Sequence, residues 1–261
     1  MSEWKIEAAQ TIQFDEIPSD LRVNLVGGEI ELKAGEGPAT LEVRYVTGPE
    51  LQVRLDHGRL EIVQEHPHPS WGLNKVSASL ALQVPTDCKV DLEAVSASVL
   101  AEGLAADVKL ETVSGEIALE SLSGKTRATT VSGELNVRGQ SGELRGETVS
   151  GDVTLDAYLA NSVRLESVSG DVTADLQQAG SSAAAEVQTV SGAVYLRLAS
   201  EPSQQVRVES VSGRLTSSFP ELKAKNGPGS RTLKGALGDG QGEVRVSTVS
   251  GAVAVLAEAS A

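Results

Sequence analysis

The tripeptide V-S-G occurs seven times between residues 113 and 251 of this chain. The serine and glycine of the successive copies are Ser114 and Gly115, Ser132 and Gly133, Ser150 and Gly151, Ser169 and Gly170, Ser191 and Gly192, Ser212 and Gly213, and Ser250 and Gly251. Successive serines are 18, 18, 19, 22, 21 and 38 residues apart, and an imperfect copy, Val95–Ala97, lies 18 residues before the first. A repeat of this period is typical of a solenoid, in which each unit packs on its neighbours.

The first repeats contain a shorter unit. Ser123 and Ser141 begin two further Ser-Gly pairs, so that such a pair falls every nine residues there. The residues between the pairs alternate apolar and polar, as at Ile117 and Leu119, which predicts short strands, while glycine permits the positive φ of a turn. Nine extended residues reach only about 30 Å, too short to enclose side chains, whereas about 18 can wrap once around a narrow core.

These spacings predict an all-β fold, a parallel β-solenoid with coils of 18 to 22 residues. Stacked coils lie about 4.8 Å apart and build ladders of Val, of Ser and of Thr or Ser. We expect a right-handed solenoid from the general handedness of parallel crossovers. Stretches rich in Gly, Pro or Ser at 177–184, 199–204 and 219–242 explain the longer steps and are predicted to be loops.

Before residue 95 the pattern is that of antiparallel hairpins. One is predicted to join Leu21–Val26 to Glu29–Lys33 through two glycines, and another to join Leu51–Leu55 to Arg59–Val63. The predicted division is an irregular antiparallel N-terminal β cap over residues 1–75 and the solenoid over residues 76–261. The alternative is one continuous domain, in which the early strands are irregular coils.

Charge and composition exclude several partners. The chain has 36 acidic and 22 basic residues, a formal net charge of −14, which would repel nucleic acids and anionic membrane surfaces. Only 3% of residues are aromatic, too few to build stacking platforms for bases or sugars. The sequence shows neither a secretory signal nor a run of about 18 apolar residues. We therefore expect a cytoplasmic protein that reaches the envelope only through a partner.

The serial copies resemble a known family. They read TVSGEI, TVSGEL, TVSGDV and SVSGDV, and with GGEIEL near the N-terminus and the closing run LKGALGDGQGEVRVSTVSGAVAVL they are similar to the bacterial putative adhesin family, domain of unknown function 4097. The resemblance covers nearly the whole chain. It implies a solenoid-like β fold and a place near cell-envelope or stress-response functions, with no catalytic residues to transfer. Many relatives carry an N-terminal membrane anchor that is not seen in this sequence, which argues against extracellular adhesion.

A metal site is the first chemical hypothesis. Acidic residues follow four Ser-Gly turns at coil spacing, namely Glu116, Glu134, Asp152 and Asp171. Carboxylates stacked about 4.8 Å apart would repel one another unless a cation such as calcium lay between them. The glycine-rich nonapeptide of calcium-binding β-rolls is absent, so we expect solvated turn residues and neither a metal nor another cofactor. His66 and His68 are too few ligands for zinc or copper.

No catalytic constellation accompanies the repeated serines. All three histidines precede residue 69, away from the V-S-G copies, and a serine nucleophile needs a neighbouring base. Hydrogen bonds to the backbone at the solenoid corners explain the serines and threonines more simply. The single cysteine, Cys88, is predicted to be an inert strand residue. We therefore expect no enzymatic activity.

Three functions remain, in order of preference. The first is a non-enzymatic scaffold or binding module whose ladder faces bind a protein partner. The second is a subunit that self-associates end to end, because the uncharged terminal strand with Val253, Val255 and Leu256 is the kind of edge that docks on another molecule. The third is a polysaccharide-active β-helix enzyme, which the scattered aromatic residues disfavour.

Overall fold

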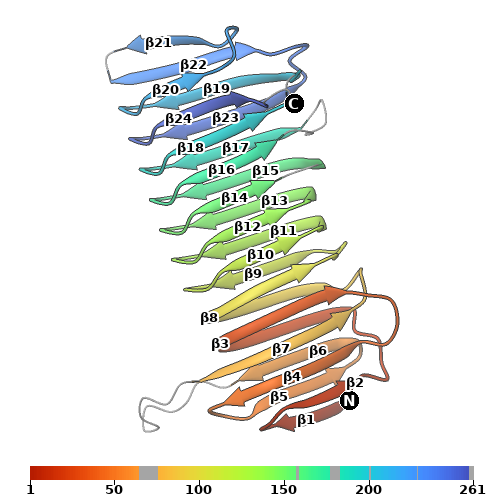
Figure 1. The fold of residues 1–261 in the computed structure, drawn as a ribbon. Helices are drawn as coiled ribbons and strands as arrows, with labels where there is room; N and C mark the ends of the chain where they lie inside the picture. The colour runs from red at the N-terminus through yellow and green to blue at the C-terminus, as the bar shows by residue number, and fades with distance from the viewer. Residues whose placement is uncertain (65–75, 157–158, 177–182, 200, 228, 259–261) are drawn as a thin grey trace. The chain divides into compact units, whose positions relative to one another are not determined.

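The computed structural model describes residues 1–64, 76–156, 159–176, 183–199, 201–227 and 229–258 (Figure 1). These residues form strands and connections, with no helix among them. Consequently none of the described segments is a helix long and apolar enough to cross a membrane. The chain divides into two compact units, unit 1 at Met1–Gly133 and unit 2 at Glu134–Ala261.

Unit 1 has its strands in two faces. They are β1 (Ser2–Ile6), β2 (Gln10–Gln13), β3 (Asp20–Ala34), β4 (Thr40–Thr47), β5 (Leu51–Asp56), β6 (Arg59–Gln64), β7 (Ser77–Val84), β8 (Lys89–Glu102), β9 (Val108–Thr112), β10 (Ile117–Glu120) and β11 (Ser123–Thr130). One face runs β1, β5, β6, β3, β8, β9, β11. The other runs β2, β4, β7, β3, β8, β10. The long strands β3 and β8 therefore contribute one half to each face.

The N-terminal part of unit 1 contains the expected antiparallel pairings, but one predicted hairpin is wrong. Residues 20–34 form the single strand β3, which pairs in parallel with β6, β7 and β8. Gly28 has a φ of 119°, and a Cβ there would lie 1.9 Å from the carbonyl oxygen of Ala78. The glycine pair thus serves a close approach inside a strand rather than a turn. The hairpin of β5 and β6 is confirmed, with positive φ at His57 and Gly58.

Unit 2 is built of stacked coils with two strands each. Its strands are β12 (Leu135–Arg138), β13 (Ser141–Thr148), β14 (Val153–Asp156), β15 (Leu159–Ser167), β16 (Val172–Leu176), β17 (Ala184–Thr189), β18 (Val194–Leu198), β19 (Gln204–Ser210), β20 (Leu215–Ser217), β21 (Lys223–Gly227), β22 (Ser230–Ala236), β23 (Gly242–Thr248) and β24 (Val253–Ala257). One face runs β12, β14, β16, β18, β24, β20, all parallel. The other runs β13, β15, β17, β23, β19, β22, β21.

Alternation along each strand fills the interior of unit 2. In β14, Val153 and Leu155 are buried while the residues between and after them are exposed. Parallel, in-register pairing then places like side chains above one another, as with Leu155 and Ala174 in neighbouring coils. The result is a narrow apolar core enclosed by the two faces. This confirms the all-β solenoid predicted from the repeat.

Each V-S-G turn is held by hydroxyl groups. In unit 2 the residue before the valine is buried, and its Oγ accepts a hydrogen bond of 2.7–3.2 Å from the glycine amide three residues later. These residues are Thr148, Ser167, Thr189, Ser210 and Thr248. The turn serine donates to the valine carbonyl of a neighbouring coil, as from Ser191 Oγ to Val168 at 3.2 Å. The hydroxyls therefore satisfy backbone groups within and between coils.

The glycine of the turn is required by space rather than by φ. A Cβ on Gly192 would lie 1.8 Å from the carbonyl oxygen of Gly170, and Gly133 meets Gly115 in the same way. None of the V-S-G glycines has a positive φ, whereas Gly124 and Gly142 of the intermediate Ser-Gly pairs do. The positive φ expected of these turns is therefore wrong for V-S-G, because the constraint comes from the neighbouring coil.

The last coils of unit 2 are not stacked in chain order. The coil of β23 and β24 lies between the coil of β17 and β18 and the coil of β19 and β20 (Figure 1). Val253 and Val255 of β24 are buried, at 1% and 0% exposure, while Leu256 is 40% exposed. Because both sides of its backbone are already paired, β24 is not the free edge that the sequence predicts. Its lack of charge fits an interior strand.

The predicted loop at 219–242 is likewise wrong. It contains β21 and β22, an antiparallel hairpin that pairs with β19. After the hairpin of β21 and β22, the chain returns to form β23 and β24 between the coil of β17 and β18 and the coil of β19 and β20. Of the other predicted loops, residues 177–182 and 200 lie outside the described residues. The boundary after residue 75 stays a prediction, although β3 before it pairs with β7 and β8 after it.

A candidate binding groove in unit 1

The valine of each V-S-G turn points outward. In unit 1, Val95, Val113 and Val131 are 40–48% exposed. The five turn valines of unit 2, which are Val149, Val168, Val190, Val211 and Val249, are 46–53% exposed. Valines of neighbouring coils are about 4.8 Å apart, so each unit carries an apolar stripe along its turns. A contiguous apolar stripe on a surface is typical of an interaction site.

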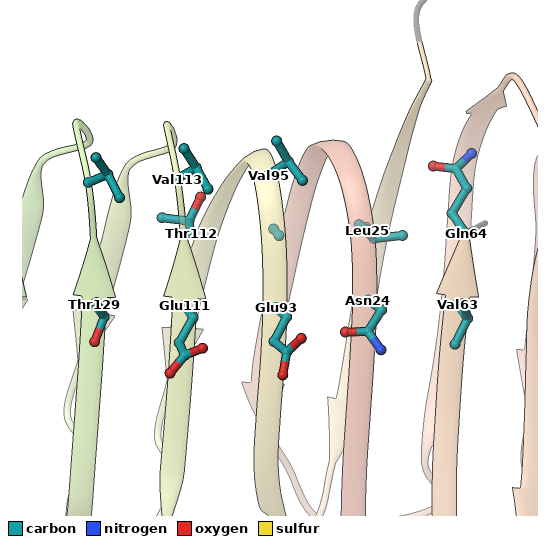
Figure 2. A pocket seen from close by; sticks show the side chains of 12 residues that line it. Asn24, Leu25, Val63, Gln64, Glu93, Val95, Glu111, Thr112, Val113 and Thr129 are labelled. Atoms are coloured by element: carbon teal, nitrogen blue, oxygen red, sulfur yellow. The ribbon is translucent and has the colours of Figure 1, made fainter. Parts of the chain in front are cut away.

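In unit 1 the valine stripe borders an open groove of about 810 Å³ (Figure 2). One row of the groove crosses β6, β3, β8, β9 and β11, and consists of Val63, Asn24, Glu93, Glu111 and Thr129. The next position along four of these strands adds Gln64, Leu25, Ala94 and Thr112, which are buried because successive side chains of a strand point to opposite sides of the sheet. Parallel pairing therefore assembles the groove from segments that are far apart in the sequence.

Four buried side-chain oxygens at this groove have no hydrogen-bond partner among the described residues. They are Asn24 Oδ1, Gln64 Oε1, Thr112 Oγ1 and Thr129 Oγ1. The amide nitrogen of Gln64 donates to the carbonyls of Thr47 and Pro49 at 3.3 and 3.1 Å, which fixes this side chain. A buried polar atom without a partner costs about 1–3 kcal/mol. The oxygens of Asn24 and Thr129 are in the row with Glu93 and Glu111, on the side of the sheet that faces the groove, whereas Gln64 and Thr112 are buried on the opposite side.

Thr112 differs from the equivalent residues of the other turns. One coil further on, the Oγ1 of Thr130 accepts a hydrogen bond of 3.0 Å from the amide of Gly133. The turn after Thr112 stacks on β8, where the chain has the imperfect copy Val95–Ala97 and runs on as a strand. The break in the repeat thus coincides with the hydroxyl that is left unpaired.

The groove carries negative charge. Glu93 and Glu111 are direct neighbours on β8 and β9. Glu111 lies 3.1 Å from the Nζ of Lys109 and raises the pKa of that lysine, while Glu93 lies 3.9 Å from Arg22. The four polar atoms of the groove that lack partners are carbonyl and hydroxyl oxygens. The groove can therefore accept hydrogen bonds and hold a positive charge against apolar side chains.

The acidic column behaves differently from a metal site. Asp152 accepts a hydrogen bond of 2.8 Å from the amide of Asp171, and Asp171 accepts one of 2.8 Å from the amide of Ala193. These carboxylates thus cap the backbone of the next coil. Glu116 in unit 1 and Glu134 in unit 2 are exposed. The described residues contain no group of three or more His, Cys, Asp or Glu placed to hold a metal ion.

The described histidine and the cysteine belong to no metal-binding group. His57 is 93% exposed in the hairpin turn, with Nδ1 3.0 Å from Asp56, and its hydrogen bond lowers the pKa of Asp56. His66, His68 and Trp71 lie outside the described residues. Cys88 is buried just before β8, and burial raises the pKa of its thiol to about 12. A thiol in that state is neutral and unreactive at physiological pH.

A family model described as Toastrack DUF4097 matches residues 19–185. The chain belongs to this family. The match confirms the resemblance drawn from the V-S-G copies, and it covers all of the strands that form the groove. A comparison with curated proteins gives no match.

Two solved structures are similar to this chain at low sequence identity. A crystal structure of a putative adhesin from Bacteroides fragilis NCTC 9343 is 13% identical, with a TM-score of 0.54, over 96% of this chain and 97% of that one. A putative lipid binding protein from Parabacteroides distasonis ATCC 8503 is 10% identical, with a TM-score of 0.43, over 97% of each chain. The first similarity supports the fold alone, and the second is too low to support an argument.

The groove is not among the sites that the sequence predicts. Nothing in the residues around Asn24 and Gln64 distinguishes them from other polar residues. They lie on strands near Glu93 only because β3 pairs with β6 and β8. One signal was present, since the imperfect copy Val95–Ala97 marks where the regular turn is lost. Its meaning depended on knowing which strand lies beside it.

Proposed function

We propose that this Toastrack protein is a non-catalytic binding scaffold whose unit 1 groove holds an extended polypeptide segment of a partner protein. The observation that carries the proposal is the row of Asn24, Glu93, Glu111 and Thr129 beside the exposed valine stripe, in which Asn24 Oδ1 and Thr129 Oγ1 have no hydrogen-bond partner among the described residues. The Bacteroides fragilis relative is named a putative adhesin, which is in keeping with a binding role.

A polypeptide fits this groove better than other ligands. An extended segment presents backbone N–H groups to the unpaired oxygens of Asn24 and Thr129, apolar side chains to the valines, and a Lys or Arg to Glu93 and Glu111. A sugar would need aromatic platforms, and none of the described residues that line the groove is aromatic. A nucleic acid or an anionic lipid headgroup would be repelled by the two carboxylates.

The same geometry argues against catalysis. Glu93 and Glu111 each lie close to a cation, and both are half-exposed, so neither resembles a general acid in an apolar pocket. Among the described residues that line the groove there is no serine, cysteine or histidine. A screen for turnover of glycans, esters and phosphates is expected to find none. Turnover that is lost in Glu111→Gln would overturn the non-catalytic proposal.

The binding test uses a random peptide library displayed on phage and selected on the full chain. Enriched peptides are synthesised, and their dissociation constants are measured by titration calorimetry. We expect peptides that combine apolar residues with Lys or Arg. Val113→Arg, which fills the groove and opposes a cationic ligand, is expected to weaken binding at least about tenfold, which corresponds to about 1.4 kcal/mol.

The matched control is Val168→Arg. Val168 occupies the same place in a V-S-G turn of unit 2 and is 46% exposed, against 48% for Val113. Peptides should bind this variant as tightly as the unmodified chain. Equal loss in both variants, or selection of no peptide, would contradict the groove as the binding site.

Self-association is the second candidate function. Its surface is not β24, because this strand is paired on both sides within the chain. We also propose a cytoplasmic location with access to the envelope only through the bound partner. Cell fractionation of the full-length protein tests this, since recovery outside the cell would contradict it.

A further inference from the structure

The hairpin at one edge of unit 2 is basic, although the chain as a whole is acidic. Residues 222–238 carry Lys223, Lys225, Arg231 and Lys234 and no acidic residue, although the whole chain has a net charge of −14. All residues of β21 are exposed. Among the described residues β21 pairs only with β22, so its other side is a free strand edge. We call β21 and β22 the basic hairpin.

The register concentrates this charge. Lys223 lies opposite Lys234, which places two cations side by side on neighbouring strands, while Arg207 of β19, opposite Lys234, forms an ion pair with Glu209 at 2.6 Å. Beside the hairpin is a hollow of about 480 Å³, whose described lining includes Arg214 and Arg231 and no carboxylate. Arg231 donates to the carbonyls of Ser212 and Gly213, whereas Arg214 is exposed. An acidic group can therefore approach Arg214 without displacing an internal ion pair.

Unit 1 has a complementary acidic edge. In the described part of the chain, β1 pairs only with β5 and β2 only with β4, so both have a free side. Residues 7–17, which include β2 and the connection to β1, carry Glu7, Asp15 and Glu16 and no basic residue. All three carboxylates are exposed, and the adjacent Ile17 is 66% exposed. We call residues 7–17 the acidic edge.

Free strand edges attract other strands unless charge prevents it. Two basic hairpins would repel each other, and so would two acidic edges, whereas a basic hairpin and an acidic edge attract. We propose that the basic hairpin of one copy binds the acidic edge of a second copy of this chain, a heterologous contact between different surfaces. A separate polyanion is disfavoured because the remaining surface would repel it.

The inference goes beyond the proposed groove, whose residues belong to other strands. It also differs from the assembly predicted from sequence, which used the strand of Val253, Val255 and Leu256. The contact depends on exposed charges, so salt should weaken it. Its failure would leave peptide binding at the groove unaffected, and the reverse also holds.

The first experiment is light scattering behind size exclusion over a hundredfold concentration range. At about 25 mM salt we expect a weight-average mass that rises with concentration to at least twice the 27.1 kDa of the chain, and at about 500 mM salt a return to the monomer. A monomer at every concentration in low salt would overturn the proposal. So would association that is insensitive to salt.

The second experiment exchanges the charges. The variant with Lys223→Glu and Lys225→Glu is expected to stay monomeric, as is the variant with Glu7→Lys and Glu16→Lys. An equimolar mixture of the two should associate, because each reversed surface then meets an opposite charge on the other variant. Recovery in the mixture also shows that both variants are folded. A mixture that stays monomeric would contradict the pairing of these two surfaces.

The control has the same change of charge elsewhere. Lys89→Glu with Arg138→Glu alters two exposed cations outside both surfaces and should associate like the unmodified chain. Loss of association in this variant would assign the effect to net charge and overturn the proposal. Added polyphosphate serves as the last probe, since association that appears only in its presence would show that the basic hairpin binds a polyanion instead.

Discussion

The close stacking of glycines at the V-S-G turns gives the sharpest test of the fold. In Gly192→Ala, the new Cβ would lie 1.8 Å from the carbonyl oxygen of Gly170, against an ordinary contact of at least 3.4 Å. The two coils must therefore separate locally by about 1.6 Å, the difference between these distances. Neighbouring backbone hydrogen bonds, from Ser191 to Val168 at 3.0 Å and from Val172 to Ala193 at 2.8 Å, would then be broken.

The cost follows from two contributions. Overpacking in a closely packed place costs about 1–3 kcal/mol, and each lost hydrogen bond costs about 0.5–1.5 kcal/mol. With two hydrogen bonds lost, we therefore expect Gly192→Ala to lower the free energy of unfolding by about 2–6 kcal/mol. Urea denaturation followed by circular dichroism measures this change, with an expected fall in the midpoint of about 1 M or more.

The matched control is Gly227→Ala in the same unit. The atom nearest to a Cβ at Gly227 is the carbonyl oxygen of Ser230 at 3.6 Å, and φ is not in the left-handed region. Its free energy of unfolding should stay within about 0.5 kcal/mol of the unmodified protein. If Gly192→Ala were equally mild, the steric explanation of the V-S-G glycine would be refuted.

Three further predictions concern single side chains. Thr189→Val removes the acceptor of the Gly192 amide and should destabilise by about 1–3 kcal/mol in urea denaturation, whereas Thr189→Ser should be mild because Ser167 and Ser210 fill the same role. Burial raises the pKa of the Cys88 thiol to about 12 in the folded chain, against 9.0 for the free group, so the free energy of unfolding should fall as pH rises from about 9 to 12. This fall should be absent in Cys88→Ala. A thiol reagent should label Cys88 only after the chain unfolds. Millimolar calcium should leave the melting temperature of the chain unchanged. Asp171→Ala loses the hydrogen bond to the Ala193 amide and should lower the free energy of unfolding by about 0.5–1.5 kcal/mol. A rise in melting temperature with calcium that this variant abolishes would restore the metal hypothesis.

Much of the fold is encoded locally and could be predicted from the sequence. The V-S-G period sets the coil length, the alternation of apolar residues sets which side chains enter the core, and Gly58 after His57 marks a hairpin turn. These features depend on contacts within one turn or one strand. They therefore appear as short patterns in the chain.

Other features depend on which strand lies beside which. The two glycines in β3 look like a hairpin turn, but the strand is continuous because β6, β7 and β8 pair along it. The groove could not be predicted for the same reason, since Asn24, Gln64 and Thr112 come to line one groove only through the pairing of their strands. Side chains that are far apart in sequence carry no local signal of their proximity.

The sequence by itself determined that this chain is a Toastrack β-solenoid with hydroxyl-bonded turns. Only the tertiary structure decided the order of its last coils and the position of its free edges. The strands of successive coils are similar in length and turn chemistry, so local preferences do not distinguish one position in the stack from the next. Burial of the uncharged β24 between paired neighbours, and exposure of the lysine-bearing β21 at the edge, give the observed order its physical reason.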